Sequence, residues 1–280
     1  MNADTIVVGA GLFGQTIASE LRRRGQVVRV LDDARPESGS APSASLMKPS
    51  WLNAVSTKDQ DISYETLDRL FHVHELRFKV GPVKLDAVRW CNPDKIRTAG
   101  PVLRGRVLSV SERRVMAIVD KLHVDISARH VVVAAGSWTH MLVPGCPPVQ
   151  AKMGAACFWP GASIPVNLIS LWAPYRQLVA FNMNGGVWAG DGTAVKPETW
   201  NPIREVESVR RCAKATGLEF GSEEDLTVLV GRRPYLDKRH LKGQPCYLAE
   251  HEGVWVATGG AKNGTIAAGW VAAQLGERLT

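Results

Sequence analysis

The chain has 280 residues, of which 45% are hydrophobic and 22% charged, and it carries a formal net charge of +7. This composition excludes a disordered or fibrous protein and predicts a sizeable core, at a length that suits about two domains. No stretch approaches the ~20 apolar residues of a membrane helix. The N-terminus lacks the features of a secretory signal, so we expect a cytoplasmic protein with no membrane partner. The positive charge permits an anionic partner, including nucleic acid, without requiring one.

The five cysteines are far apart in the sequence, and none forms a CxxC pair. Scattered cysteines in odd number argue against a disulfide framework and against a zinc site. We therefore expect reduced thiols and no metal centre. The missing CxxC pair also excludes the disulfide reductases.

The N-terminal region predicts a strand, a glycine-rich turn, a helix and a second strand in succession. Residues 5–8 are β-branched and apolar, as in a buried parallel strand. The turn at residues 9–14 reads GAGLFG, and the helical pattern after it stops at Gly25. The second strand, residues 27–31, is followed directly by Asp32.

Each part of this pattern suits a dinucleotide. Gly9 allows a tight turn, Gly11 lets the backbone approach a pyrophosphate, and Gly14 lets the helix pack against the strand. The helix N-terminus offers free N–H groups and the positive end of its dipole to phosphates. Asp32 lies 23 residues after Gly9, where an acid accepts hydrogen bonds from a ribose and disfavours NADP. We therefore predict a dinucleotide site, for NAD or FAD.

The rest of the chain predicts mostly strands. Residues 107–110 and 115–119 indicate a hairpin, and residues 131–135 indicate a buried strand that runs into Gly136. A mainly antiparallel sheet is expected from four further runs, at 150–158, 166–171, 177–183 and 186–191. A helix is expected at residues 203–216. Residues 254–258 predict a late strand, followed by a second glycine-rich turn and a helix.

Five segments besides the first glycine turn form a recognisable set. They read SASLM at 43–47, VVVAAGSW at 131–138, GVWAGDGT at 186–193, GRRP at 231–234 and VWVATGGAKNGT at 254–265. Together they resemble the FAD-dependent D-amino-acid oxidase family, close to glycine oxidase and sarcosine oxidase. The resemblance covers both ends and most of the second half of the chain, and it is thin across residues 53–105.

The resemblance implies an α/β fold: a FAD-binding Rossmann-like domain of the glutathione-reductase type with a smaller, mainly antiparallel substrate domain. We expect the FAD-binding domain at residues 1–55, 98–145 and 245–280, and the substrate domain at 56–97 and 146–244. The chain is short for this family, which implies a smaller cap and a more open active site.

The resemblance also implies FAD as the cofactor and assigns residues to it. The ADP half would lie on the first glycine turn, and the flavin on the late turn, with the helix dipole near the isoalloxazine. The residues implied as cofactor contacts are Gly9, Ala10, Gly11, Leu12, Phe13, Gly14, Asp32, Asp33, Ser43, Ala44, Ser45, Met47, Ala135, Gly136, Trp138, Gly231, Gly259, Gly260, Lys262, Asn263, Gly264 and Thr265.

The implied reaction is hydride transfer from an amine-bearing carbon to flavin N5, followed by imine hydrolysis and reoxidation of the flavin by molecular oxygen. Arg233 is expected to bind a substrate carboxylate through a charge-assisted bidentate pair. Lys262 stands where the family more often has arginine, and it is the second candidate for the carboxylate or for flavin charge. Lys48 either lies over the flavin and helps oxygen react, or is a solvated loop lysine.

Two substrate classes remain open. One is free glycine, sarcosine or a D-amino acid. The other is an amino acid attached to a nucleic-acid base in DNA or RNA, as in members of the family that modify phage thymidine or the tRNA wobble uridine. The net charge, the short cap and basic runs at 104–114 and 232–242 agree with the second class. A non-catalytic flavin-binding protein and an NAD dehydrogenase are the alternatives from other classes.

Overall fold

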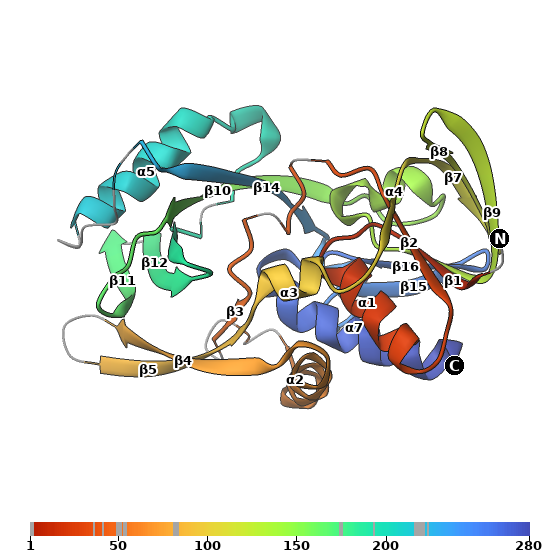
Figure 1. Cartoon of the computed structure of the whole chain (residues 1–280), viewed down its shortest axis with the longest axis horizontal. Helices are drawn as coiled ribbons and strands as arrows, with labels where there is room; N and C mark the ends of the chain where they lie inside the picture. The colour runs from red at the N-terminus through yellow and green to blue at the C-terminus, as the bar shows by residue number, and fades with distance from the viewer. Residues whose placement is uncertain are drawn as a thin grey trace.

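The computed structural model describes residues 3–35, 37–40, 42–48, 52, 55–80, 84–173, 176–192, 194–215, 222 and 224–280. These residues form two large sheets that lie side by side, with helices packed on their faces (Figure 1). Within the described residues, no helix is long and apolar enough to cross a membrane.

The first sheet contains the predicted dinucleotide unit. Its strands run in the order β15-β16-β9-β1-β2-β6, and a hairpin of β7 and β8 extends from β9. Neighbouring strands from β16 to β6 pair in parallel. The bounds are β1 (Ala3–Val8), β2 (Val28–Asp32), β6 (Val102–Arg104), β7 (Arg106–Ser111), β8 (Arg114–Val119), β9 (Leu122–Val133), β15 (Tyr247–His251) and β16 (Val254–Thr258).

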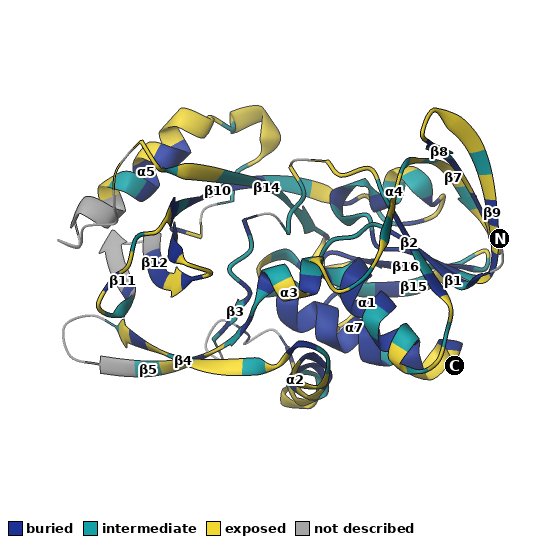
Figure 2. Ribbon diagram, in the orientation of Figure 1, coloured by how far each residue is buried: buried dark blue, intermediate teal, exposed yellow. Residues whose placement is uncertain are grey.

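Both faces of the central strands are covered, which explains their continuous apolar sequence. Val7 of β1 packs toward α1 (Leu12–Arg23) and α7 (Gly264–Leu279). The neighbouring Ile6 and Val8 pack on the other side, against the β7–β8–β9 sheet. Figure 2 shows α7 buried along most of its length, in agreement with an apolar sequence on all sides of this helix.

The second sheet is antiparallel except where β4 pairs in parallel with β11. Its order is β14-β10-β13-β12-β11-β4-β5-β3. The bounds are β3 (Leu46–Met47), β4 (Val73–Val80), β5 (Lys84–Cys91), β10 (Gln150–Pro160), β11 (Asn167–Ala173), β12 (Arg176–Met183), β13 (Gly186–Gly190) and β14 (Thr227–Tyr235). The helix α5 (Pro202–Ala215) packs on this sheet through Val206 and Val209.

The predicted secondary structure is confirmed at most positions. The strand–turn–helix–strand unit, the hairpin, the four strands of the second sheet, and the helix now seen as α5 all occur within one or two residues of the expected bounds. The late strand and helix are β16 and α7. The predicted α/β architecture with a second, mainly antiparallel sheet is therefore correct.

Two elements join parts of the molecule that the expected domain segments separate. The helix α2 (Thr57–Phe71) falls in the segment assigned to the substrate domain, yet its apolar face packs on α7 through Leu67 and Ile266. The strand β3 falls in the segment assigned to the FAD-binding domain, yet it pairs with β5 of the second sheet. Among the described residues there are also the short α-helices α3 (Pro93–Arg97), α4 (Thr139–Leu142) and α6 (Lys238–Leu241).

Candidate active site

A cavity of about 1360 Å³ lies between the two sheets, at the carboxyl ends of β1 and β2. Its wall includes the loops after β1, β2, β9 and β16 on one side, and β13 and β14 on the other. Ligands of open parallel sheets bind outside these strand ends, where the loops and helix N-termini converge. The cavity therefore occupies the position at which the sequence predicts a dinucleotide.

The first glycine turn has the geometry that its sequence predicts. Gly9 has φ +104°, and a Cβ atom there would lie 2.5 Å from the carbonyl oxygen of Ala134. A Cβ atom on Gly14 would overlap the carbonyl oxygen of Gly9, so α1 could not pack as closely. Gly11 faces the cavity at the start of α1. The N-terminus of α1, and with it the positive end of the helix dipole, therefore lies at the cavity wall.

Asp32 holds the turn as well as lining the cavity. One carboxylate oxygen accepts from the N–H of Ala10 at 2.7 Å, and the other accepts from the N–H of Ala34 at 2.7 Å. Arg104 donates to the same carboxylate at 3.2 Å. A carboxylate has about four acceptor sites, so these bonds leave capacity for a ribose hydroxyl.

The segment after β2 lies against the first turn. Ser40 accepts from the N–H of Leu12 through its hydroxyl oxygen at 2.9 Å. Further along, the backbone carbonyls of Ala44 and Ser45 accept from the indole N–H of Trp90 at 3.0 Å and from the N–H of Cys91 at 3.4 Å. These donors belong to β5, so the second sheet fixes one wall of the cavity.

The late glycine turn meets the first one. Gly259 has φ +81° and packs against Leu236. A Cβ atom on Gly260 would lie 2.8 Å from the ring of Phe13, in the first turn. Beyond this turn, Gly264 and Thr265 open α7 at the cavity wall, so the N-termini of two long helices face the same space. Their dipoles both favour a ligand that carries or develops negative charge.

The cavity collects most of the residues that the sequence predicts for the site. Those in its wall are Gly9, Ala10, Gly11, Leu12, Phe13, Asp32, Asp33, Ser43, Ala44, Ser45, Ala135, Gly136, Trp138, Arg233, Gly260, Lys262, Gly264 and Thr265. Six predicted residues lie outside the wall: Gly14, Met47, Lys48, Gly231, Gly259 and Asn263. The glycines among these six act through packing; Gly231, for example, lies against Pro42.

Lys48 does not lie over the cavity. Its ammonium forms an ion pair with Asp86 at 2.9 Å, and its side chain is largely buried. Met47 is also buried in the core, next to Leu12 and Leu67. Two positions were expected for Lys48, over a flavin or in a solvated loop. The structure shows neither, because Lys48 follows β3 directly and pairs with Asp86 of β5.

Arg233 lies in the cavity wall on β14, on the side of the second sheet. It donates to the carbonyl oxygen of Gly192 at 3.2 Å. Lys262 is exposed at the cavity wall. Arg233 and Lys262 thus both contribute positive charge to the cavity wall.

Trp188 of β13 also lines the cavity. It lies across Gly190, where a Cβ atom would be 2.6 Å from the indole ring. The structure adds wall residues that sequence reasoning missed. Asp191, which is almost fully buried, accepts from the hydroxyl of Ser208 at 3.1 Å. The motif at 186–193 contained this residue, but nothing in its pattern distinguished it. Arg97 of α3 also lines the cavity, in a region without any recognisable motif.

The described cysteines do not offer a nucleophile. Burial raises the pKa of Cys91 and Cys157 to about 12 and that of Cys146 to about 11. Burial also raises the pKa of Cys246. Thiols of this kind stay protonated and unreactive at neutral pH. Nor does the described part of the chain contain a group of three or more side chains that could hold a metal ion.

Comparison with known proteins gives the same fold. No family model matches the chain, and no curated protein matches its sequence. Among solved structures, a glycerol-3-phosphate dehydrogenase from Bacillus halodurans complexed with FAD has a TM-score of 0.70 at 14% identity, over 98% of this chain and 63% of that chain. The present chain thus spans less than two thirds of that dehydrogenase.

Two oxidases match over nearly their whole length. Glycine oxidase from Bacillus cereus has a TM-score of 0.68 at 15% identity, over 99% of this chain and 94% of that chain. Iminodiacetate oxidase from Chelativorans has a TM-score of 0.65 at 16% identity, over 97% of this chain and 93% of that chain. These likenesses establish the fold class that the sequence predicted.

Proposed function

We propose that the protein is an FAD-dependent oxidoreductase that oxidises the carbon–nitrogen bond of an amine or amino acid. The observation that carries this proposal is the meeting of two glycine turns, each leading into a helix N-terminus, in one cavity that also contains Arg233. Solved structures with the same fold include a glycine oxidase, an iminodiacetate oxidase and a dehydrogenase complexed with FAD.

The residues present suit FAD. Gly9 and Gly14 let the turn and α1 pack closely, since a Cβ atom on either would meet a backbone carbonyl oxygen, and Gly11 lines the cavity at the start of α1. Asp32 lies where a ribose would bind, and the late turn with α7 would hold the flavin end. A cavity of about 1360 Å³ exceeds the roughly 300–1000 Å³ of a usual ligand pocket, so it accommodates a dinucleotide and a small substrate together.

When bound, FAD would supply the acceptor for the hydride of the substrate, and molecular oxygen is the proposed final acceptor. The chain itself binds and orients the substrate. Arg233, held by the carbonyl oxygen of Gly192, would bind a carboxylate, with Lys262 adding positive charge nearby. Lys48 has no part in this proposal because it pairs with Asp86.

An amino acid attached to a nucleic-acid base is the second candidate substrate, beside a free amino acid. Charge favours it: among the described residues of the cavity wall, cations outnumber anions. The cations are Arg35, Arg97, Arg104, Arg106, Arg232, Arg233 and Lys262, and the anions are Asp32, Asp33 and Asp191. A wall of this kind attracts polyanions through its field. The cysteines whose side chains the structure describes are buried and free of disulfides, which supports the proposed cytoplasmic location.

The proposal is tested by anaerobic reduction of the FAD-loaded protein with glycine, with sarcosine, and with DNA bearing a glycyl-modified thymine. Bleaching of the flavin by one of these donors supports the proposal and identifies the substrate class. Arg233→Gln should raise the donor concentration for half-maximal bleaching about 10- to 100-fold, because a charge-assisted pair is lost. Arg211→Gln, which removes an exposed cation paired with Glu207 on α5, is the matched control. Bound FAD that no donor bleaches would favour a non-catalytic flavin-binding protein.

A further inference from the structure

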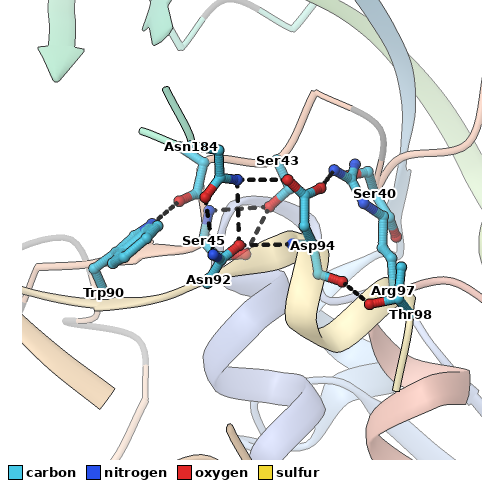
Figure 3. A network of polar contacts seen from close by, with 10 residues as sticks. Ser40, Ser43, Ser45, Trp90, Asn92, Asp94, Arg97, Thr98 and Asn184 are labelled. Carbon is cyan, nitrogen blue, oxygen red and sulfur yellow. Dashed lines mark hydrogen bonds and ion pairs between the residues drawn. The ribbon is translucent and has the colours of Figure 1, made fainter. Parts of the chain in front are cut away.

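A polar network joins α3 to the turn between β12 and β13 (Figure 3). Asn92 caps α3 by accepting from the N–H of Asp94 at 2.9 Å. Asn184, in the β12–β13 turn with φ +50°, donates to the Asp94 carboxylate at 2.5 Å. The side chains of Asn92 and Asn184 also exchange hydrogen bonds, at 2.8 and 3.3 Å. A turn of the second sheet is thereby tied to a helix that packs on α1.

The network continues through Arg97 to the first glycine turn. Arg97 forms an ion pair with Asp94 through one guanidinium nitrogen, and donates to the carbonyl oxygen of Ser40 at 3.1 Å through the other. Ser40 in turn accepts from the N–H of Leu12 at 2.9 Å. Arg97 therefore lies in the cavity wall, and Ser40 links its guanidinium to Leu12 at the start of α1.

A cation beside the start of α1 would strengthen the binding of a pyrophosphate there. The turn at residues 9–14 contains no basic residue, so it offers only backbone N–H groups and the helix dipole to two negative charges. A guanidinium is planar, always charged, and suited to two phosphate oxygens at once. The contacts of several wall cations lead elsewhere: Arg104 contacts Asp32, Arg35 contacts Asp33, and Arg232 contacts Glu37 and Trp138. Besides its ion pair with Asp94, Arg97 contacts Ser40, whose hydroxyl accepts from Leu12 at the start of α1.

We infer that Arg97 binds the pyrophosphate of the dinucleotide, and that Asp94 and Asn184 are positioning residues that hold its guanidinium at the start of α1. This inference rests on the proposed function, because it needs a dinucleotide in the cavity. It makes the β12–β13 turn of the second sheet part of cofactor binding.

The ion pair itself contributes little to the stability of the fold. The Asp94 side chain is 50% exposed and the Arg97 side chain 31% exposed, and exposed pairs stabilise proteins weakly. Variants at these positions should therefore fold. Their effect should be seen in ligand affinity and in its dependence on salt.

The experiment measures FAD affinity by quenching of flavin fluorescence and ADP affinity by calorimetry, each at about 30 and about 300 mM salt. Arg97→Gln should weaken both ligands about 10- to 100-fold at low salt, and should reduce the slope of affinity against salt. Arg97→Lys should recover part of the loss, since it restores the charge without the fork. Asp94→Asn and Asn184→Ala should weaken both ligands about 3- to 10-fold, because the guanidinium is less well oriented.

The control is Arg211→Gln, which removes a cation from an exposed ion pair with Glu207 on α5. It should leave affinity and salt slope unchanged. The inference is overturned if Arg97→Gln binds FAD and ADP as tightly as the wild type. It is also overturned if affinity falls with an unchanged salt slope and a lowered unliganded melting temperature, because Arg97 would then act only by supporting the Ser40 segment. Wild-type protein that binds neither FAD nor ADP would contradict the proposed function instead.

Discussion

Two regions of one cavity wall are built in different ways. The first glycine turn is fixed by close neighbours in its own strand–turn–helix unit: Gly14 packs on Gly9, and Asp32 accepts from Ala10. The segment from Ser40 to Met47 is fixed by donors about fifty residues away, on β5 and α3. A binding loop can therefore be held in its conformation by a local sequence motif or by side chains of another sheet.

Substitution in the glycine turn should have the largest effect. Gly14→Ala places a Cβ atom on the carbonyl oxygen of Gly9, so α1 must move away from β1. We expect the free energy of unfolding to fall by about 1–3 kcal/mol. FAD affinity should fall about 100-fold, equivalent to about 3 kcal/mol. Urea denaturation and flavin fluorescence measure the two effects.

The matched control is Gly25→Ala, at the end of α1. Gly25 has φ +90° but no atom lies within 4 Å of its added Cβ. This variant should lose about 1 kcal/mol of stability through backbone strain and keep its FAD affinity. A Gly14→Ala protein that binds FAD like the wild type would show that close packing of the turn is not needed.

The C-terminal end of α1 provides a second test of how contacts stabilise the strand–turn–helix unit. Glu20 is fully buried and pairs with Arg23 and Arg24 at the end of α1 and with Arg69 of α2, which joins the two helices. Burial raises the pKa of this carboxyl, but hydrogen bonds from Arg23 and Arg24 and the charge of Arg69 outweigh burial and lower the pKa to about 2. Glu20→Gln should reduce the free energy of unfolding by about 2 kcal/mol at about pH 7, a value discounted for the partly exposed arginines.

The contribution of Glu20 should depend on pH with a definite sign. The carboxyl titrates near 4.5 in the unfolded chain and near 2 in the folded protein, so its stabilisation is complete above about pH 5 and is lost as the pH falls toward 2. The difference between wild type and Glu20→Gln in urea denaturation should therefore shrink at about pH 3. Glu207→Gln, in an exposed pair with Arg211, should cost less than about 0.5 kcal/mol. A Glu20→Gln difference that stays constant with pH would contradict this assignment.

The second region should respond more weakly to single changes, because several donors share the task of holding it. Trp90→Phe keeps the ring but loses the hydrogen bond to the carbonyl oxygen of Ala44. FAD affinity should fall about 5-fold, as expected for one hydrogen bond of about 1 kcal/mol. Trp255 lies on β16 beside Arg278, and Trp255→Phe should leave FAD affinity unchanged. Equal losses in both variants would mean that Trp90 acts through general packing.

The difference between local and long-range contacts also explains which parts of the fold could be predicted from the sequence. The β1–α1–β2 unit, the strands β10 to β13 of the second sheet and the β16–α7 unit follow from local periodicity and glycine spacing, and these predictions are confirmed. The strands β3, β4, β5 and β14 of the second sheet were not predicted. The packing of α2 on α7 was not anticipated, since it depends on contacts between residues about two hundred positions apart. An apolar helix face predicts that this face is buried, but it does not indicate which element packs on it.

The candidate site was predictable to a similar extent. Glycines and carboxylates with fixed spacing, such as Gly9 and Asp32, could be placed from the sequence alone. Arg97 and Ser40 could not, because their roles come from one hydrogen-bonded chain across three segments. Lys48 shows the opposite error: its position beside a motif suggested a role at the flavin, whereas Asp86 of β5 holds its ammonium elsewhere.

The central claim is that the cavity between the two sheets binds FAD. The most direct test is to incubate the purified protein with FAD, remove the excess, and record the absorbance spectrum and the flavin content. We expect one FAD per chain, with a flavin band near ~450 nm, and we expect Gly14→Ala to lose this FAD. A colourless protein that keeps no FAD, and that binds NAD in the same experiment, would contradict it.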